Sequence, residues 1–135
     1  MNMTNSIIEF RRYLKRRNYS KHTIKNYLHS IKQFVLWVDV PIEEMTPDKI
    51  SAYIDHLMKR GLSSLTINSS LYRIKSFYNY LHYEKELSIS VPVKTNSCLR
   101  TPKPLPRFLR DEDVEKFLGV VKGARDHAMC LVMLR

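Results

Sequence analysis

The segment from Ser20 to Val38 constrains the fold more than any other part of the sequence. Its apolar residues recur every three or four positions, so they share one face of a helix for about four turns. These residues are Ile24, Tyr27, Leu28, Ile31, Phe34, Val35 and Val38. Ser20 stands where an N-cap is expected, because its hydroxyl can accept a backbone N–H of the first turn. The segment therefore predicts an amphipathic helix that packs against other elements.

The other face of this helix is strongly basic. Between Phe10 and Val38 the sequence has eight Lys or Arg residues and no Asp or Glu. The whole chain of 135 residues has a formal net charge of +10, which favours a polyanion such as nucleic acid as partner. A solvated helix that uses Lys for solubility is an equally good interpretation of a single basic face.

Three further amphipathic helices are predicted before residue 88. The first begins at Ser6, with Glu9 as its partner in a capping box. Another begins at Thr46, which is followed by Pro47 at the first helical position, and it ends at Gly61. The last begins at Ser63 or Ser64, and its expected core residues are Ile67, Leu71, Ile74, Tyr78 and Leu81.

The composition changes after Leu87. Residues 88–106 contain four prolines and three basic residues without any Asp or Glu, which is typical of a linker. Residues 107–135 predict two more helices, one that starts with acidic residues at Asp111 and one that starts near Ala124. The sequence stops at Arg135 inside the last helix, so we expect it to be cut, either artificially or by a truncated reading frame.

The sequence carries no motif for catalysis or for cofactor binding. It lacks metal-ligand spacings, a phosphate-binding glycine loop and nucleophile motifs, so we expect no cofactor, no metal and no small-molecule substrate. Cys98 and Cys130 are expected to be free thiols. No apolar run is long enough for a membrane span or a signal peptide, which makes a cytoplasmic protein without a membrane partner the expectation.

The order of the segments resembles the tyrosine recombinases, also called phage-type integrases. Their second helix is similar to Ser20-x-His22-Thr23-Ile24-x-x-Tyr27 followed by Phe34. Their fourth helix is similar to Gly61-Leu62-Ser63, Thr66-Ile67-Asn68 and Leu71-x-x-Ile74-x-x-Phe77-Tyr78-x-Tyr80-Leu81. Their linker and first catalytic-domain helices are similar to Pro104-Leu105-Pro106 with Leu109, Asp111-Glu112-Asp113-Val114 and Arg125-Asp126-x-Ala128.

This resemblance implies an all-α fold. Residues 1–87 would form the SAM-like core-binding domain of integrases, a four- to five-helix bundle of crossed helical hairpins. Residues 88–106 would be a basic linker, and residues 107–135 would be two helices of an incomplete catalytic domain. Arg135 lacks the glycine that precedes the family's first catalytic arginine. We therefore assign no catalytic residue, and we expect the chain alone to be unable to cleave or join DNA.

The resemblance also implies double-stranded DNA as partner. The second and fourth helices would grip a recombination half-site, and other recombinase protomers would be partners of the full-length protein. The family's groove-facing positions correspond to Lys21, His22, Thr23, Lys25, Asn26 and His29 on the second helix, and to Thr66, Ser69, Ser70 and Arg73 on the fourth. Lys and Arg are expected to meet phosphates, whereas Thr23 and Asn26 are expected to reach base edges.

Two other functions are compatible with the same residues. One is a non-catalytic helical interaction module that uses its basic face to bind an acidic protein. The other is a truncated integrase decoy, or a regulator of excision, that occupies DNA without acting on it. The salt dependence of duplex binding distinguishes the first of these from a recombinase fragment.

Overall fold

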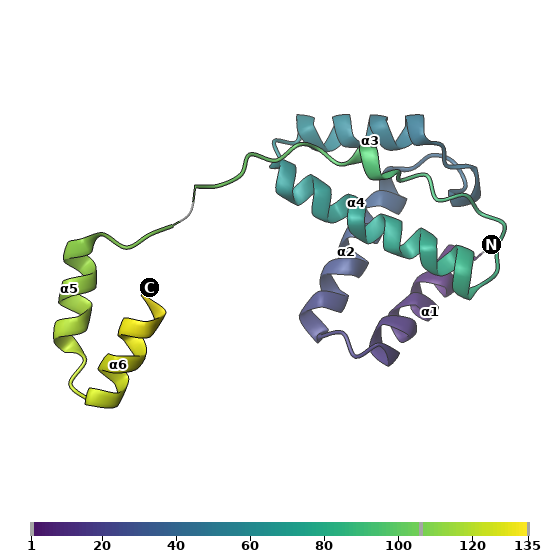
Figure 1. The fold of residues 1–135 in the computed structure, drawn as a ribbon. Helices are drawn as coiled ribbons and strands as arrows, with labels where there is room; N and C mark the ends of the chain where they lie inside the picture. The colour runs from purple at the N-terminus through teal and green to yellow at the C-terminus, as the bar shows by residue number, and fades with distance from the viewer. Residues whose placement is uncertain (1, 106, 135) are drawn as a thin grey trace. The chain divides into compact units, whose positions relative to one another are not determined.

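The computed structural model describes residues 2–105 and 107–134, so Met1, the last linker residue Pro106 and the unassigned Arg135 lie outside the described residues. The chain divides into two compact units, Met1–Thr101 and Pro102–Arg135. The described residues form six α-helices and no strand, and the helices are labelled in Figure 1. The predicted all-α fold is confirmed.

The first helical hairpin joins α1 (Met3–Arg16) to α2 (Lys21–Trp37). Asn18 makes the turn between them with a positive φ of 59°, a left-handed conformation that Asn tolerates better than most residues. Ser20 then caps α2 as predicted, because its hydroxyl accepts the backbone N–H of Thr23 at 3.1 Å. The predicted apolar face of α2 is the buried one, with Ile31 and Phe34 fully enclosed.

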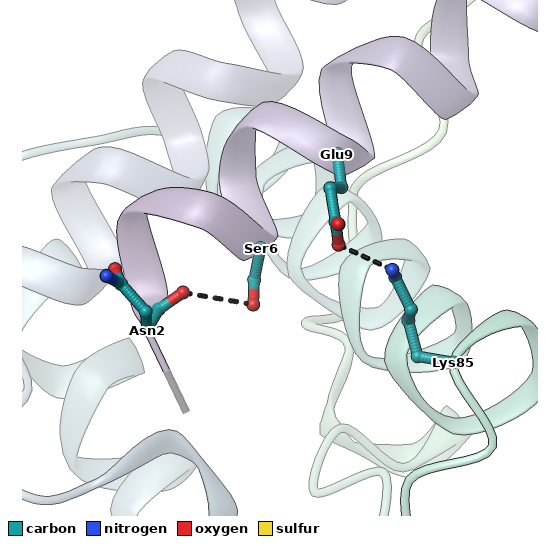
Figure 2. A network of polar contacts seen from close by, with 4 residues as sticks. All are labelled: Asn2, Ser6, Glu9 and Lys85. Atoms are coloured by element: carbon teal, nitrogen blue, oxygen red, sulfur yellow. Dashed lines mark hydrogen bonds and ion pairs between the residues drawn. The ribbon is translucent and has the colours of Figure 1, made fainter.

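The capping box predicted at Ser6 is wrong. The helix α1 already begins at Met3, so Ser6 lies within it, and the buried Ser6 hydroxyl donates to the carbonyl oxygen of Asn2 at 3.3 Å (Figure 2). The Glu9 carboxylate forms an ion pair with Lys85 Nζ at 2.6 Å instead (Figure 2). Met3 packs against the core, so tertiary packing extends the helix beyond the start that the local capping signal indicates.

The second hairpin joins α3 (Pro47–Lys59) to α4 (Ser64–Asn79), which lie side by side in Figure 1. A short 3₁₀ helix, η1 (Ile42–Glu44), precedes α3, and a π-helical turn, η2 (Tyr80–Glu84), continues α4. Thr46 and Ser63 cap the two helices. Gly61 closes α3 with a φ of 75°, which explains why a glycine stands there.

The core of the first unit lies where α4 crosses α2. Aromatic side chains connect the two hairpins, because the ring of Phe10 packs edge-on against Phe77 at 5.2 Å and Phe34 packs edge-on against Tyr53 at 5.1 Å. The hydroxyl of Tyr78 donates to the carbonyl oxygen of Ile42 at 3.1 Å, so α4 is also tied to η1. The two hairpins therefore share a single core.

Residues 85–101, which we call the strap, pack against the helices of the first unit. Ile89 and Val93 are buried in the core, and Leu87, Val91 and Leu99 are partly buried against it. A 3₁₀ turn, η3 (Thr95–Ser97), interrupts the extended backbone. The compact unit therefore continues to Thr101, beyond the boundary that the change in composition indicates after Leu87.

The second unit contains α5 (Asp111–Val120) and α6 (Ala124–Met133). Both helices begin where the sequence predicts, and three acidic residues occupy the first turn of α5. Val114 and Leu118 of α5 line a shallow pocket together with Leu131 of α6, so the two helices face each other with their apolar sides. None of the described residues of these helices is buried.

Candidate nucleic-acid interface

An open groove of about 530 Å³ lies between α2 and α4 of the first unit. Its lining combines residues of both helices with one residue of the strap. These residues are Thr23, Asn26 and Tyr27 from α2, Leu65, Asn68, Ser69, Tyr72 and Arg73 from α4, and Cys98 from the strap. We call this feature the α2–α4 groove. Four of the residues expected to bind DNA, Thr23, Asn26, Ser69 and Arg73, are brought together in it.

The two helices α2 and α4 begin with the same capping arrangement. The hydroxyls of Ser20 and Thr23 lie 2.8 Å apart at the start of α2, and those of Ser63 and Thr66 lie 3.0 Å apart at the start of α4. In each case the Ser hydroxyl also accepts the backbone N–H of the Thr. The hydroxyls of Ser20 and Ser63 therefore cap the two helices, and those of Thr23 and Thr66 are already engaged with them in the free protein.

Asn26 and Ser69 differ in whether their side-chain hydrogen-bonding groups are already occupied within the protein. The hydroxyl of Ser69 donates to the carbonyl oxygen of Leu65 at 2.9 Å, which occupies its proton within α4. The Asn26 amide is half-buried, and it has no hydrogen-bond partner among the described residues. Its donor and its acceptor both remain available to a ligand in the groove.

Arg73 is the cation in the lining of the groove. One of its guanidinium nitrogens, Nη1, donates to Ser30 Oγ of α2 at 3.0 Å. Within the described chain no carboxylate is paired with Arg73, so its charge is not neutralised by the protein. The remaining N–H donors of the guanidinium are suited to phosphate oxygens.

Sequence reasoning missed the apolar part of the groove. Leu65 and Tyr72 are 68% and 66% exposed, although both are large hydrophobic residues. Tyr27 is buried at the groove floor, and burial raises the pKa of its phenol, so the phenol stays neutral at physiological pH. The signal was the i, i+4, i+7 spacing of Leu65, Ser69 and Tyr72, which places them on one face of α4.

The other expected residues lie outside the lining of the groove. On α2 they are the exposed side chains of Lys21, His22, Lys25 and His29. Lys21, Lys25 and His29 are spaced four residues apart and so form one stripe along the helix. On α4, Thr66 is exposed and Ser70 is half-buried. The structure therefore separates the expected set into a group within the groove, a basic flank on α2, and two α4 residues, Thr66 and Ser70, that belong to neither.

Charge is distributed unevenly over the first unit. No Asp or Glu occurs in residues 10–38 or in residues 59–83, the segments that contain α2 and α4. Acidic residues are concentrated between these segments, where they belong to η1, α3 and the adjoining turns: Asp39, Glu43, Glu44, Asp48 and Asp55. The helices that line the groove therefore present positive charge without compensating carboxylates of their own.

No group of three His, Cys, Asp or Glu residues in the described part of the chain is placed to hold a metal ion. Helices of the length and apolarity needed to cross a membrane are likewise absent from residues 2–105 and 107–134. Cys98 and Cys130 are both free thiols, as expected.

Comparison with known proteins agrees with the resemblance seen in the sequence. The sequence model of the phage integrase N-terminal SAM-like domain matches residues 7–87. Tyrosine recombinase XerC of Syntrophus aciditrophicus is 31% identical over 94% of this chain and 46% of its own length. The XerC protein of Bacillus subtilis is 29% identical over 95% of this chain and 45% of its own.

Tyrosine recombinase XerD of Halalkalibacterium halodurans is 30% identical over 90% of this chain and 42% of its own length. The chain thus spans slightly less than half the length of these curated relatives. The matched segment contains α1 from Ile7 onward and all of α2, α3 and α4. The chain belongs to the phage integrase family through its N-terminal SAM-like domain.

Proposed function

We propose that this chain is the DNA-binding portion of a site-specific tyrosine recombinase and that it grips double-stranded DNA through the α2–α4 groove and its basic flank. The observation that carries the proposal is the uneven distribution of charge. The two helices that line the groove have no acidic residue, whereas five of the eight acidic residues in positions 1–101 lie on η1, α3 and the turns beside them. A surface of this kind attracts the phosphate backbone of DNA.

The residues of the interface divide into two roles. Arg73 in the groove, with Lys21 and Lys25 on the flank, is suited to phosphate oxygens, which position the protein without reading sequence. Asn26 is suited to a base edge, because its amide is unpartnered and can bond an adenine in a bidentate manner. The side chain of Ser69 is small, so it allows the DNA backbone to approach α4 closely.

The assembly and the reaction belong to a longer protein in this proposal. The relatives are named tyrosine recombinases, and the chain corresponds to slightly less than half of each. We therefore assign strand exchange between DNA sites, and assembly with further recombinase protomers, to the full-length protein. Residues 1–101 would hold the half-site, and residues 107–135 would begin the catalytic domain. A cytoplasmic location follows from DNA as the partner.

The salt dependence of binding tests this proposal. Fluorescence anisotropy with a labelled duplex of recombination-site sequence is measured at a series of salt concentrations. If about six phosphates are contacted, the affinity falls on the order of a thousandfold between 50 and 200 mM salt. An affinity that does not change with salt, or no binding to any duplex at low salt, would contradict the proposal and would favour an acidic protein as partner.

A further inference from the structure

Asn68 makes two hydrogen bonds to the same backbone residue in the strap. Its Nδ2 donates to the carbonyl oxygen of Leu99 at 2.8 Å, and its Oδ1 accepts the backbone N–H of Leu99 at 2.7 Å. The two residues are 31 positions apart in sequence. Asn68 stands on α4 and lines the groove, so this pair of bonds ties the strap directly to the candidate interface.

The clamp fixes the part of the strap nearest to the groove. Leu99 is partly buried against the core, and the preceding residue, Cys98, lines the groove. The following residue, Arg100, is exposed. Upstream, Ile89 and Val93 are held by apolar burial, but between Val93 and Leu99 no side chain of the strap is buried. The Asn68 amide is therefore the polar anchor that determines where the end of the strap lies.

We propose that Asn68 is a positioning residue that places Arg100 beside the α2–α4 groove, where Arg100 contacts a phosphate of the DNA held in that groove. This inference rests on the proposed function and adds a third element, the strap, to the two helices. Asn68 does not supply the phosphate contact; it restricts the backbone on either side of Leu99. An anchored cation loses less conformational freedom on binding than one on a mobile linker.

The role requires an amide and not only a residue of similar size. Asparagine presents a donor and an acceptor side by side, which matches the carbonyl and the N–H of one backbone residue. Aspartate would keep the acceptor for the Leu99 N–H but would place a carboxylate oxygen opposite the Leu99 carbonyl. Alanine would remove both bonds and would leave the strap attached through Ile89 and Val93.

A double-mutant cycle in the full chain of 135 residues tests the inference. The salt slope of duplex binding is measured for wild type, Arg100→Ala, Asn68→Ala and the double variant. In the wild-type background, Arg100→Ala is expected to lower the magnitude of the slope by about one, the effect of a lost phosphate contact. In the Asn68→Ala background, Arg100→Ala is expected to leave the salt slope unchanged, because Arg100 is no longer held beside the groove.

Amide hydrogen exchange of the free chain provides a readout that does not depend on DNA. Asn68→Ala should speed exchange of the Leu99 amide at least tenfold, since that N–H loses its acceptor, and should leave the Leu71 amide in α4 unchanged. Asn68→Asp should retain part of the protection of Leu99. The matched control is Asn79→Ala, a half-buried asparagine on the same helix, which should alter neither the exchange nor the slope.

The possible outcomes separate the inference from the proposed function. If Arg100→Ala lowers the slope equally in both backgrounds, Asn68 contributes independently and the inference is overturned. It is also overturned if Arg100→Ala has no effect while the wild-type chain binds DNA, or if Asn68→Ala leaves Leu99 protected. If the wild-type chain binds no duplex, the proposed function itself fails, and the inference fails with it.

Discussion

Arg73 on α4 donates from Nη1 to Ser30 Oγ on α2 at 3.0 Å, although the two residues are 43 positions apart in sequence. Ser30 is only 4% exposed, so the bond anchors the guanidinium to a rigid part of the core. The interaction joins the two helices whose separation defines the groove. It also orients a cation whose other donors remain available, so Arg73 combines a structural role with a proposed role in binding.

Substitution Arg73→Ala should weaken binding to every duplex, whatever its sequence. The variant removes a phosphate contact, so the magnitude of the salt slope should decrease by about one. It should also lower the free energy of unfolding by about 1 kcal/mol, because the buried Ser30 hydroxyl loses its partner. Anisotropy titrations and urea unfolding measure the two effects separately. Lys59→Ala on α3 removes the same charge away from the groove, and an equal loss of affinity in that variant would contradict the assignment.

Substitution Asn26→Ala should affect sequence preference more than affinity in general. Loss of a bidentate amide contact should cost about 1–3 kcal/mol on the specific site, with little effect on a duplex of scrambled sequence. The melting temperature should stay near that of wild type, because the Asn26 amide makes no hydrogen bond in the described structure. Competition titrations with the two duplexes measure the difference. Asn5→Ala on α1 is a suitable control, and an equal loss on both duplexes would assign Asn26 to the backbone instead.

Stability should decline at alkaline pH because of Tyr78. Burial raises the pKa of its phenol above the ordinary value of 10, and the hydroxyl donates to the buried carbonyl of Ile42. The unfolded chain ionises near pH 10 while the folded chain does not, so this contribution to stability is full below about pH 10 and is lost as pH rises further. Urea unfolding from pH 8 to pH 11 measures the decline.

The control for this effect is Tyr78→Phe. The variant should be less stable at neutral pH by about 1 kcal/mol, because it lacks the hydrogen bond to Ile42. Its stability should decline less steeply above about pH 10, because one titrating group has been removed. An alkaline decline as steep as that of wild type would assign the effect to another group, such as Tyr53, because burial also raises the pKa of its phenol.

Amide hydrogen exchange should be faster in α5 and α6 than in α2 to α4. None of the described residues of α5 and α6 is buried, whereas α2 and α4 enclose Ile31, Phe34 and Leu71. Two short helices that face each other bury little apolar area, so local opening costs little free energy. Exchange monitored by mass spectrometry or NMR measures this. Protection of α6 as strong as that of α4 would contradict the expectation.

The sequence predicts a helix correctly where its apolar spacing and its capping residue indicate the same segment. The apolar stripes of α2, α3 and α4 and the caps at Ser20, Thr46 and Ser63 locate the helices correctly, because each stripe is the side that becomes buried. The predicted start of α1 at Ser6 is wrong because Met3 packs against the core, and a local capping signal contains no information about a tertiary contact. Tyr80 is buried but Tyr83 is 72% exposed, since the π-helical turn shifts the register that a regular helix would have.

Residues 88–106, which overlap most of the strap, predict a linker because they contain four prolines and no Asp or Glu. Leu87, Ile89, Val91 and Val93 alternate along the strap, which is the pattern of an extended chain with one buried side. The candidate site was predicted only in part, because the family positions on α2 and α4 include Arg73 and Asn26 but not Tyr72 or Cys98. Which exposed residues share a groove depends on how α4 crosses α2, and periodicity within one helix does not contain that information.

We propose that duplex DNA occupies the groove between α2 and α4. The most direct test of this proposal is a titration of the isotopically labelled chain with a recombination-site duplex, followed by amide chemical shifts in NMR spectra. We expect the largest shifts at the groove residues Thr23, Asn26, Ser69 and Arg73, with little change at Asp48 and Asp55 on α3. Shifts concentrated on α1 or α3, with the amides of α2 and α4 unchanged, would contradict the proposal.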